Sequence, residues 1–319
     1  MNARHASELF IDIGGTNIRI SRGVIDGLGE IEHFKTQEFS DLKGVLSKYK
    51  SKYAEEQVET VYAAVAAPVV GDRAKLTNAD FFVCADDVTA IYTGADTTVI
   101  NDGEALAWQF ANEEALDIRY IQRGAKSDYV NNLIVAPGTG LAAAAFFGDP
   151  VKPRVIGTEY GHVRPAPSSA LQSDLFNFFF ERDEYLSAET LVSGPGLFNI
   201  YKALSAKNGA TGAAIDPKEI VAAAIEKTDE NATQATDIFL TLLGSICGDL
   251  ALTFSADRVC IAGNLILAMM PLLENSAIVN EFTNKGRMSH LVSATGFGIL
   301  EVEEPVLAGL YAFSRNDVL

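Results

Sequence analysis

Two short glycine-rich segments, each following an apolar stretch, have the residue types of turns that bind phosphate. The first runs from Asp12 to Asn17 and contains Gly14, Gly15 and Thr16. Adjacent glycines let the backbone turn tightly and approach an anion closely, and the threonine adds a hydroxyl donor. A carboxylate beside a phosphate cradle indicates an intervening cation, so Asp12 is expected to hold Mg²⁺, directly or through water. A plain hairpin turn is the alternative, and the joint occurrence of these residue types disfavours it.

The second segment consists of Gly138, Thr139 and Gly140, after another apolar run. It also fits the G-x-G-x-x-A fingerprint of dinucleotide-binding folds, which requires a full helix after the turn. Here the following apolar run stops at Gly148, too early for a crossover helix. The sequence therefore favours a second phosphate turn over a dinucleotide site, and both over a purely structural turn.

A polar pair, Asn101 and Asp102, follows a strand expected at 97–100. A carboxylate in that place lies at the sheet edge where α/β folds bind ligands. Asp102 could instead cap the helix expected at 104–112. On this motif alone capping is the better interpretation, and it does not exclude a catalytic role.

Three further side chains have the chemistry to hold a small polar ligand. Glu159 and His162 lie three residues apart in a glycine-containing loop, and Glu189 follows later. Carboxylates and imidazole accept hydrogen bonds from hydroxyl groups, whereas a metal site would need more ligands nearby. Taken alone, the two glutamates are more often solvated surface acids. Gly263 lies in a small-residue turn where a purine ring could lie against backbone, and a purely structural turn is equally expected.

The order of the expected elements indicates an α/β protein built from two similar parts. Each part begins with a strand, a glycine-rich turn and a strand, at 9–13 and 17–24 and again at 133–136 and 141–147. A chain of 319 residues is too long for one ordinary core. This order suggests the duplicated layout of actin-like ATPases. Other expected elements are strands at 31–39, 61–69 and 259–262, and helices at 41–53, 86–92, 171–182, 196–207, 217–227, 233–254 and from 304 onward.

Composition excludes several classes of protein. The formal net charge of −17 repels phosphate backbones, which argues against a nucleic-acid partner. The most apolar long stretch, 238–254, is interrupted by polar residues and glycines, so it predicts a core helix and not a membrane span. No signal-peptide pattern precedes the first strand. Three widely spaced cysteines fit a reducing cytoplasm better than a disulfide framework.

Taken together, these segments resemble the bacterial hexokinase-type glucokinase family over nearly the whole chain. The resemblance rests on an ordered series: LFIDIGGTNIRIS, AVAAPVVGDRAKLTN, VINDGEALA, VAPGTGLAAA, GTEYGHV, SAETLVSGPGLFNIYKAL, CIAGNLI and FTNKGRMSHLVS. It implies a two-lobed actin-like ATPase fold, ribonuclease H-like, with a central ligand cleft. The small lobe would be residues 1–102 with about 301–319, and the larger lobe 103–300. The cysteine-rich zinc segment of the related repressor, open-reading-frame and kinase family is absent, which indicates the zinc-free branch.

The resemblance also implies an ATP-dependent glucokinase that uses Mg²⁺. Asp102 would be the catalytic base, and the sugar site would comprise Asn101, Gly138, Glu159, His162 and Glu189. The nucleotide phosphates would face Gly14, Gly15, Thr16, Asn17, Thr139 and Gly140, with adenosine near Gly263. The expected partners are a small-molecule sugar and a nucleotide, with no nucleic acid and no membrane, and a homodimer is left open.

Three departures from the family pattern keep alternatives open. Gly103-Glu104 replaces the usual Phe-Thr after the catalytic pair, Tyr160 replaces a glycine before the site histidine, and Asn264 replaces a glycine in the adenosine turn. Another hexose or another phosphoryl donor is therefore the first alternative. A non-catalytic, kinase-like sugar sensor is the second, and the intact aspartates and both turns favour the enzyme.

Overall fold

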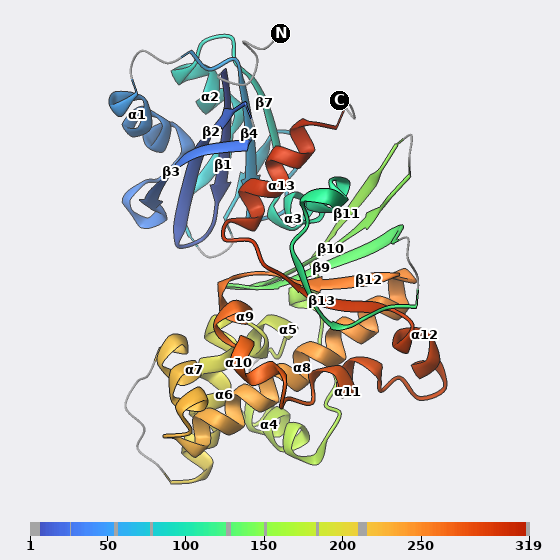
Figure 1. Ribbon diagram of the computed structural model, residues 1–319. Helices are drawn as coiled ribbons and strands as arrows, with labels where there is room; N and C mark the ends of the chain where they lie inside the picture. Colours follow the sequence, from blue (N-terminus) through green and yellow to red (C-terminus); the bar gives the residue numbers. More distant parts are fainter. Residues whose placement is uncertain are drawn as a thin grey trace. The chain divides into compact units, whose positions relative to one another are not determined.

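The computed structural model describes residues 7–25, 27–53, 57–76, 79–125, 129–149, 152–182, 185–209 and 216–316. Contacts between residues divide the chain into two compact units (Figure 1). The first unit is drawn from residues 1–116, 151–157 and 304–319, and the second from 117–150 and 158–303. Both units combine sheets and helices, so the α/β fold class is confirmed. The chain thus returns to its first unit twice, at residues 151 and 304.

The first unit is built on a sheet whose described strands have the order β3-β2-β1-β4-β7. Strands β1, β4 and β7 run parallel, and β2 pairs antiparallel with both β1 and β3. Strand β1 is buried along its whole length, as its apolar run predicts for a central strand. The strands of this unit are β1 (Glu8–Ile13), β2 (Asn17–Val24), β3 (Gly27–Lys35), β4 (Thr60–Val65), β5 (Arg73–Lys75), β6 (Phe82–Cys84) and β7 (Asp96–Asn101).

Helices from both ends of the chain cover this sheet. Helices α1 (Leu42–Lys52) and α2 (Ala85–Ile91) contribute to an apolar core with β1, β2 and β4. The C-terminal helix α13 (Pro305–Ser314) packs against α3 (Asp102–Trp108), where Phe313 meets Trp108 edge to face. A Cβ at Gly309 would overlap the backbone carbonyl of Ala105, so the two helices touch at backbone level.

The second unit contains strands in the order β10-β9-β12-β13-β8. Strand β12 runs parallel to its neighbours β9 and β13, so β9 and β12 end at the same edge. The strands of this unit are β8 (Ile118–Gln122), β9 (Asn131–Pro137), β10 (Leu141–Phe147), β12 (Arg258–Ile261) and β13 (Gly296–Leu300). Strand β11 (Arg154–Thr158) falls mostly in the segment 151–157 of the first unit. The helices are α4 (Ala170–Phe180), α5 (Ala188–Leu191), α6 (Gly194–Lys207), α7 (Pro217–Glu226), α8 (Glu230–Phe254), α9 (Asn264–Ala268), α10 (Met270–Leu273), α11 (Ile278–Thr283) and α12 (Ser289–Ser293).

Helix α8 is the centre of the second unit. It packs against α6, α7 and α11, and its side chains from Ala232 to Ala251 form much of the apolar core. Among the described residues it is the one helix long and apolar enough to cross a membrane, yet 61% of its most apolar window is buried inside the protein. The prediction of a core helix in this stretch is therefore confirmed.

Candidate active site

The first glycine-rich turn joins β1 to β2. Two of its carbonyl groups accept hydrogen bonds from Thr36, the residue that follows β3. Thr36 donates its hydroxyl to the Gly14 carbonyl (2.7 Å) and its N–H to the Thr16 carbonyl (3.1 Å). In the part of the chain that the structure describes, the N–H groups of Gly15 and Thr16 donate to no acceptor. Successive backbone N–H groups in a turn form a concavity that binds anions. The predicted phosphate turn therefore has the geometry that phosphate binding requires.

Asp12 is buried at the end of β1 and is held by its cross-strand partner. Arg19 Nη1 donates to Asp12 Oδ2 at 2.8 Å, and Arg19 Nε lies 2.8 Å from Glu304 Oε2, without hydrogen-bond alignment. Burial raises the pKa of Asp12 to about 6; Arg19 opposes this shift and Glu304 adds to it. The other Asp12 oxygen, Oδ1, has no hydrogen-bond partner among the described residues. One carboxylate beside a phosphate turn fits Mg²⁺, which is usually bound by one or two carboxylates together with substrate phosphates and water.

Asn101 and Asp102 lie at the same sheet edge as the first turn. The register aligns Ile13, Val65 and Asn101, so Asp102 follows β7 two strands away from Gly14, at about 10 Å by ordinary strand spacing. The side chain of Asn101 accepts from the N–H groups of Gly103 (2.9 Å) and Glu104 (3.4 Å). Asn101 is thus the helix cap, and the expectation that Asp102 caps the helix is wrong. Asp102 is the first residue of α3, and its Oδ1 accepts from the N–H of Gly103 at 2.8 Å.

The second glycine-rich turn joins β9 to β10 in the second unit. The Gly138 N–H donates to the Gly140 carbonyl, and the Gly138 carbonyl accepts from the Gly194 N–H at the start of α6, both at 2.8 Å. The N–H groups of Thr139 and Gly140 find no acceptor in the described ranges. Gly263 follows β12 at the same edge with φ of 109°, and a Cβ there would lie 3.5 Å from the Pro137 carbonyl. The second turn and the expected adenosine turn are therefore neighbours.

Glu159, His162 and Glu189 come together beside the second turn. His162 Nδ1 lies 3.5 Å from Glu189 Oε1, and His162 Nε2 lies 3.8 Å from Glu159 Oε2. A Cβ at Gly140 would lie 2.8 Å from Glu189 Oε2, and one at Gly161 would lie 2.5 Å from the Leu141 carbonyl. Gly140 therefore leaves room for the Glu189 carboxylate, and Gly161 lets its loop approach the backbone of Leu141. The side chains of Glu159 and His162 are about half exposed, so the three acceptors are open to a polyhydroxyl ligand.

Two of the residues that differ from the family pattern, Tyr160 and Glu104, have defined surroundings. The ring of Tyr160 packs against the apolar core of the second unit, and burial raises its pKa to about 12, with Asp249 adding to the rise. Glu104 is partly buried in α3; burial raises its pKa, and the N–H groups of Asn101 and Gly157 oppose the rise. Tyr160 thus replaces glycine by filling space on the core side of its loop.

The structure groups the predicted residues by unit. Asp12, the first turn, Asn101 and Asp102 share one sheet edge of the first unit, while the second turn, Gly263 and the Glu159–His162–Glu189 cluster share one region of the second. The sequence did not predict two side chains that hold the site in place: Thr36, which holds the first turn, and Glu304, which pairs with Arg19. Thr36 carries no motif that could have revealed it. Glu304 precedes Pro305 at a helix start, and that position could have marked it as a helix cap.

Comparison with known proteins identifies the family. A family model described as Glucokinase matches residues 9–317. The chain belongs to the glucokinase family. A glucokinase of Saccharophagus degradans is 32% identical over 310 residues, covering 95% of this chain and 96% of that relative. One of Zymomonas mobilis is 32% identical over 314 residues, covering 96% of this chain and 97% of the relative.

A solved structure agrees with this family. The crystal structure of a glucokinase from an Antarctic psychrotroph has a TM-score of 0.79 and 27% identity, covering 96% of this chain and 98% of that one. The prediction of a hexose kinase of the glucokinase type is therefore confirmed. The individual roles assigned to the site residues stay predictions.

Proposed function

We propose that this protein transfers the γ-phosphoryl group of ATP to the 6-hydroxyl of glucose, giving glucose 6-phosphate and ADP. One observation carries the proposal. In a chain of the glucokinase family, Asp102 stands two strands from a turn with unpaired N–H groups, at one sheet edge. A carboxylate and an anion cradle at that spacing suit a proton acceptor and a phosphoryl donor.

Different residues of the chain act on the sugar and on the nucleotide. Asp102 accepts the proton of the attacking hydroxyl as the new P–O bond forms, and Asn101 binds a neighbouring hydroxyl. Glu159, His162, Glu189 and backbone at Gly138 hold the other sugar hydroxyls. The phosphates face the turn from Gly14 to Asn17 together with Thr139 and Gly140, and adenosine lies near Gly263.

Phosphoryl transfer depends mainly on positioning and on charge stabilisation. Mg²⁺, held at Asp12 directly or through water, would neutralise charge on the phosphates when bound. The buried pair of Asp12 with Arg19 fixes the carboxylate before any ligand arrives. A preset carboxylate loses little freedom on binding, which favours affinity.

The finer assignments belong to the same proposal. The fold would be the two-lobed, ribonuclease H-like architecture of actin-like ATPases, zinc-free, with lobes at 1–102 plus about 301–319 and at 103–300. Sugar binding would close the lobes around a central cleft and exclude water that otherwise hydrolyses ATP. A cytoplasmic location fits this role, and so does either a monomeric or a homodimeric state.

The alternatives are a kinase for another hexose or phosphoryl donor, and a non-catalytic sugar sensor. A coupled assay of ADP release over glucose, mannose, fructose and N-acetylglucosamine, with ATP and other donors, separates them. Fastest turnover with glucose and ATP is expected. Turnover mainly with another sugar or donor would replace the substrate, and sugar binding without turnover in any combination would favour the sensor.

A further inference from the structure

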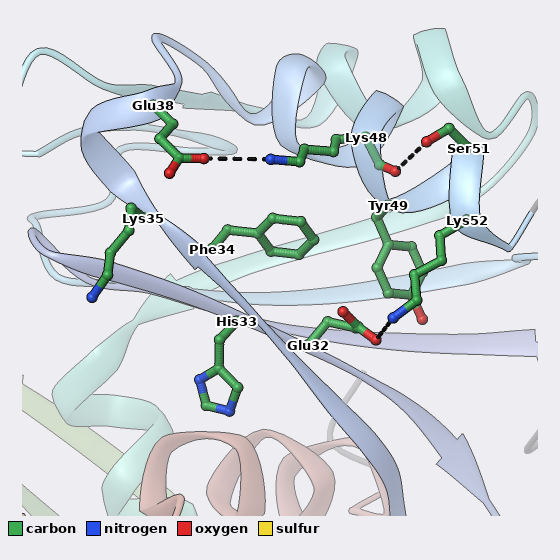
Figure 2. Close-up of a pocket in the computed structure, with 9 residues that line it drawn as sticks. All are labelled: Glu32, His33, Phe34, Lys35, Glu38, Lys48, Tyr49, Ser51 and Lys52. Carbon is green, nitrogen blue, oxygen red and sulfur yellow. Dashed lines mark hydrogen bonds and ion pairs between the residues drawn. The ribbon is translucent and has the colours of Figure 1, made fainter.

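Three lysines line a pocket of about 450 Å³ between β3 and α1, and they differ in their partners (Figure 2). Lys48 lies 3.4 Å from Glu38, and Lys52 pairs with Glu32. Figure 2 shows both pairs as dashed lines, whereas the Lys35 side chain points away from them. Within the described ranges, no carboxylate oxygen lies within 4 Å of Lys35 Nζ. Of the three, Lys35 is the cation whose charge is not matched by an acid.

Lys35 instead reaches the first glycine-rich turn. It is the cross-strand partner of Asn17 in the pairing of β2 with β3, and side chains of such partners lie on the same face. Its Nζ donates to Asn17 Oδ1 at 2.7 Å. The next residue, Thr36, holds the turn's carbonyls. The end of β3 therefore braces the turn from behind and places an exposed ammonium beside it.

The hydrogen bond also fixes how Asn17 presents its amide. An ammonium only donates, so the oxygen of the Asn17 amide must face Lys35, and the NH₂ group must face the other way. The turn thus offers the N–H groups of Gly15 and Thr16, the Asn17 amide donors and one positive charge. The nearby Arg19 is already shared by two carboxylates.

We propose that Lys35 binds the phosphate chain of the nucleotide and at the same time orients Asn17 toward it. The proposal rests on the proposed function, because it assumes that a nucleotide occupies the first turn. A protein with a net charge of −17 repels a nucleoside triphosphate, so an unmatched cation at the turn has a large local effect. Lys35 is a phosphate-binding residue and takes no part in proton transfer.

The test compares Lys35→Met with Lys48→Met and Lys52→Met, which remove lysines that line the same pocket but are paired with acids. Binding of adenosine, ADP and ATP is measured by calorimetry on the whole chain, beside the kinetics with glucose. Lys35→Met should weaken ATP binding roughly 10- to 100-fold, the range of a hydrogen bond to a charged group. The affinity for ADP should fall less, and the affinity for adenosine should not change. Both control variants should bind all three ligands as the wild type does. The ATP affinity of Lys35→Met should also depend less on salt.

Several results would overturn the proposal. An ATP affinity of Lys35→Met equal to the wild type, or an equal loss for adenosine and ATP, would show that Lys35 does not act on phosphate. If Lys35→Met does not fold, Lys35→Arg and Lys35→Gln serve instead: arginine should keep the preference for ATP over adenosine, and glutamine should lose it. A wild type that binds ATP through Lys35 but phosphorylates no hexose would refute the proposed function and leave this inference standing.

Discussion

The two aspartates at the carboxyl edge of the first sheet have different surroundings. Asp12 is buried and shares Arg19 with Glu304, so its carboxylate is fixed and partly neutralised. Asp102 is half-buried at the first position of α3 and accepts from the N–H of Gly103. Asp102 is therefore the more accessible of the two carboxylates, so it is the better candidate for the base.

Substitution of Asp102 by asparagine removes the proton acceptor and keeps the size of the side chain. We expect kcat to fall about 10²- to 10⁴-fold, the usual contribution of a general base. Glucose binding, measured by calorimetry, should remain detectable. Asp96→Asn, at the exposed opposite end of β7, serves as the control and should keep its kcat. A near-normal kcat in Asp102→Asn would remove Asp102 from the reaction.

The cluster around His162 makes a separate prediction about the sugar. If these side chains accept from sugar hydroxyls, each removal leaves a desolvated hydroxyl unpaired, at about 1 to 3 kcal/mol. His162→Ala and Glu189→Gln should therefore raise the KM for glucose roughly 5- to 150-fold, while the KM for ATP stays the same. The exposed Glu181→Gln is the control in the same unit. A change in the KM for ATP alone would mean that the two ligand sites are assigned the wrong way round.

At the scale of elements, local sequence predicted the two strand–turn–strand pairs well and several other strands poorly. The pairs at 9–24 and 133–147 are confirmed, because apolar runs around adjacent glycines leave few other conformations. The strand expected at 31–39 instead spans Gly27–Lys35, since Thr36 turns the chain to hold the first turn. Strands β5, β6, β8, β11 and β13 were missed. They are short, so no local pattern marks them, and β8 and β13 also pair with each other from distant parts of the chain.

The candidate site shows the same division between local and tertiary information. The glycine turns and the Asn101–Asp102 pair could be found by residue type. The proximity of Glu189 to the second turn could not, because it depends on the packing of Gly140 and Gly161 against parts of the chain far away in sequence. The cap at Asn101 in place of Asp102 likewise depends on which side chain the strand end turns toward the helix.

The contact between α13 and α3 supports a prediction about packing that also tests catalysis. An exposed Gly→Ala change in a helix normally stabilises it by about 1 kcal/mol. At Gly309 the added Cβ would overlap the Ala105 carbonyl, and backbone cannot move aside cheaply. Gly309→Ala should instead destabilise the first unit by about 1 to 3 kcal/mol. Because Ala105 lies one helical turn after Asp102, kcat should fall as well.

Tryptophan fluorescence measures this effect in one unit. The chain has a single tryptophan, Trp108, which is buried in α3 of the first unit. Urea unfolding followed by its emission should show a lower midpoint for Gly309→Ala. The control Ser314→Ala, in the same helix, should stay within about 0.5 kcal/mol of the wild type. A raised midpoint in Gly309→Ala would show that the two helices have room between them.

At the scale of the whole molecule, acidity and burial work against each other. The chain has 42 acidic and 25 basic residues, so its surface is strongly negative near neutral pH. Each unit nevertheless has its own apolar core, and charged side chains inside those cores are few among the described residues. Asp12 is one of them, and it lies in the sheet that the first unit is built on. Its ionisation should therefore be visible in the stability of that unit.

The expected dependence on pH follows from the shifted pKa of Asp12. Its pKa is about 6 in the folded protein and 3.8 without the fold, because burial disfavours the carboxylate. The folded state therefore binds the proton more tightly, and this stabilisation, about 3 kcal/mol in full, is present below pH 3.8 and lost as pH rises through 6. Roughly 1 kcal/mol of it should disappear between pH 5 and 7, a range that stays above the sequence pI of about 4.6.

The measurement is urea unfolding followed by the fluorescence of Trp108, without Mg²⁺ or nucleotide. Over that pH range the wild type should lose stability relative to Asp12→Asn. The exposed control Asp72→Asn should lose as much stability as the wild type. A constant difference between wild type and Asp12→Asn from pH 5 to 7 would mean that the Asp12 carboxyl does not titrate in that range in the folded protein, which would contradict a pKa of about 6.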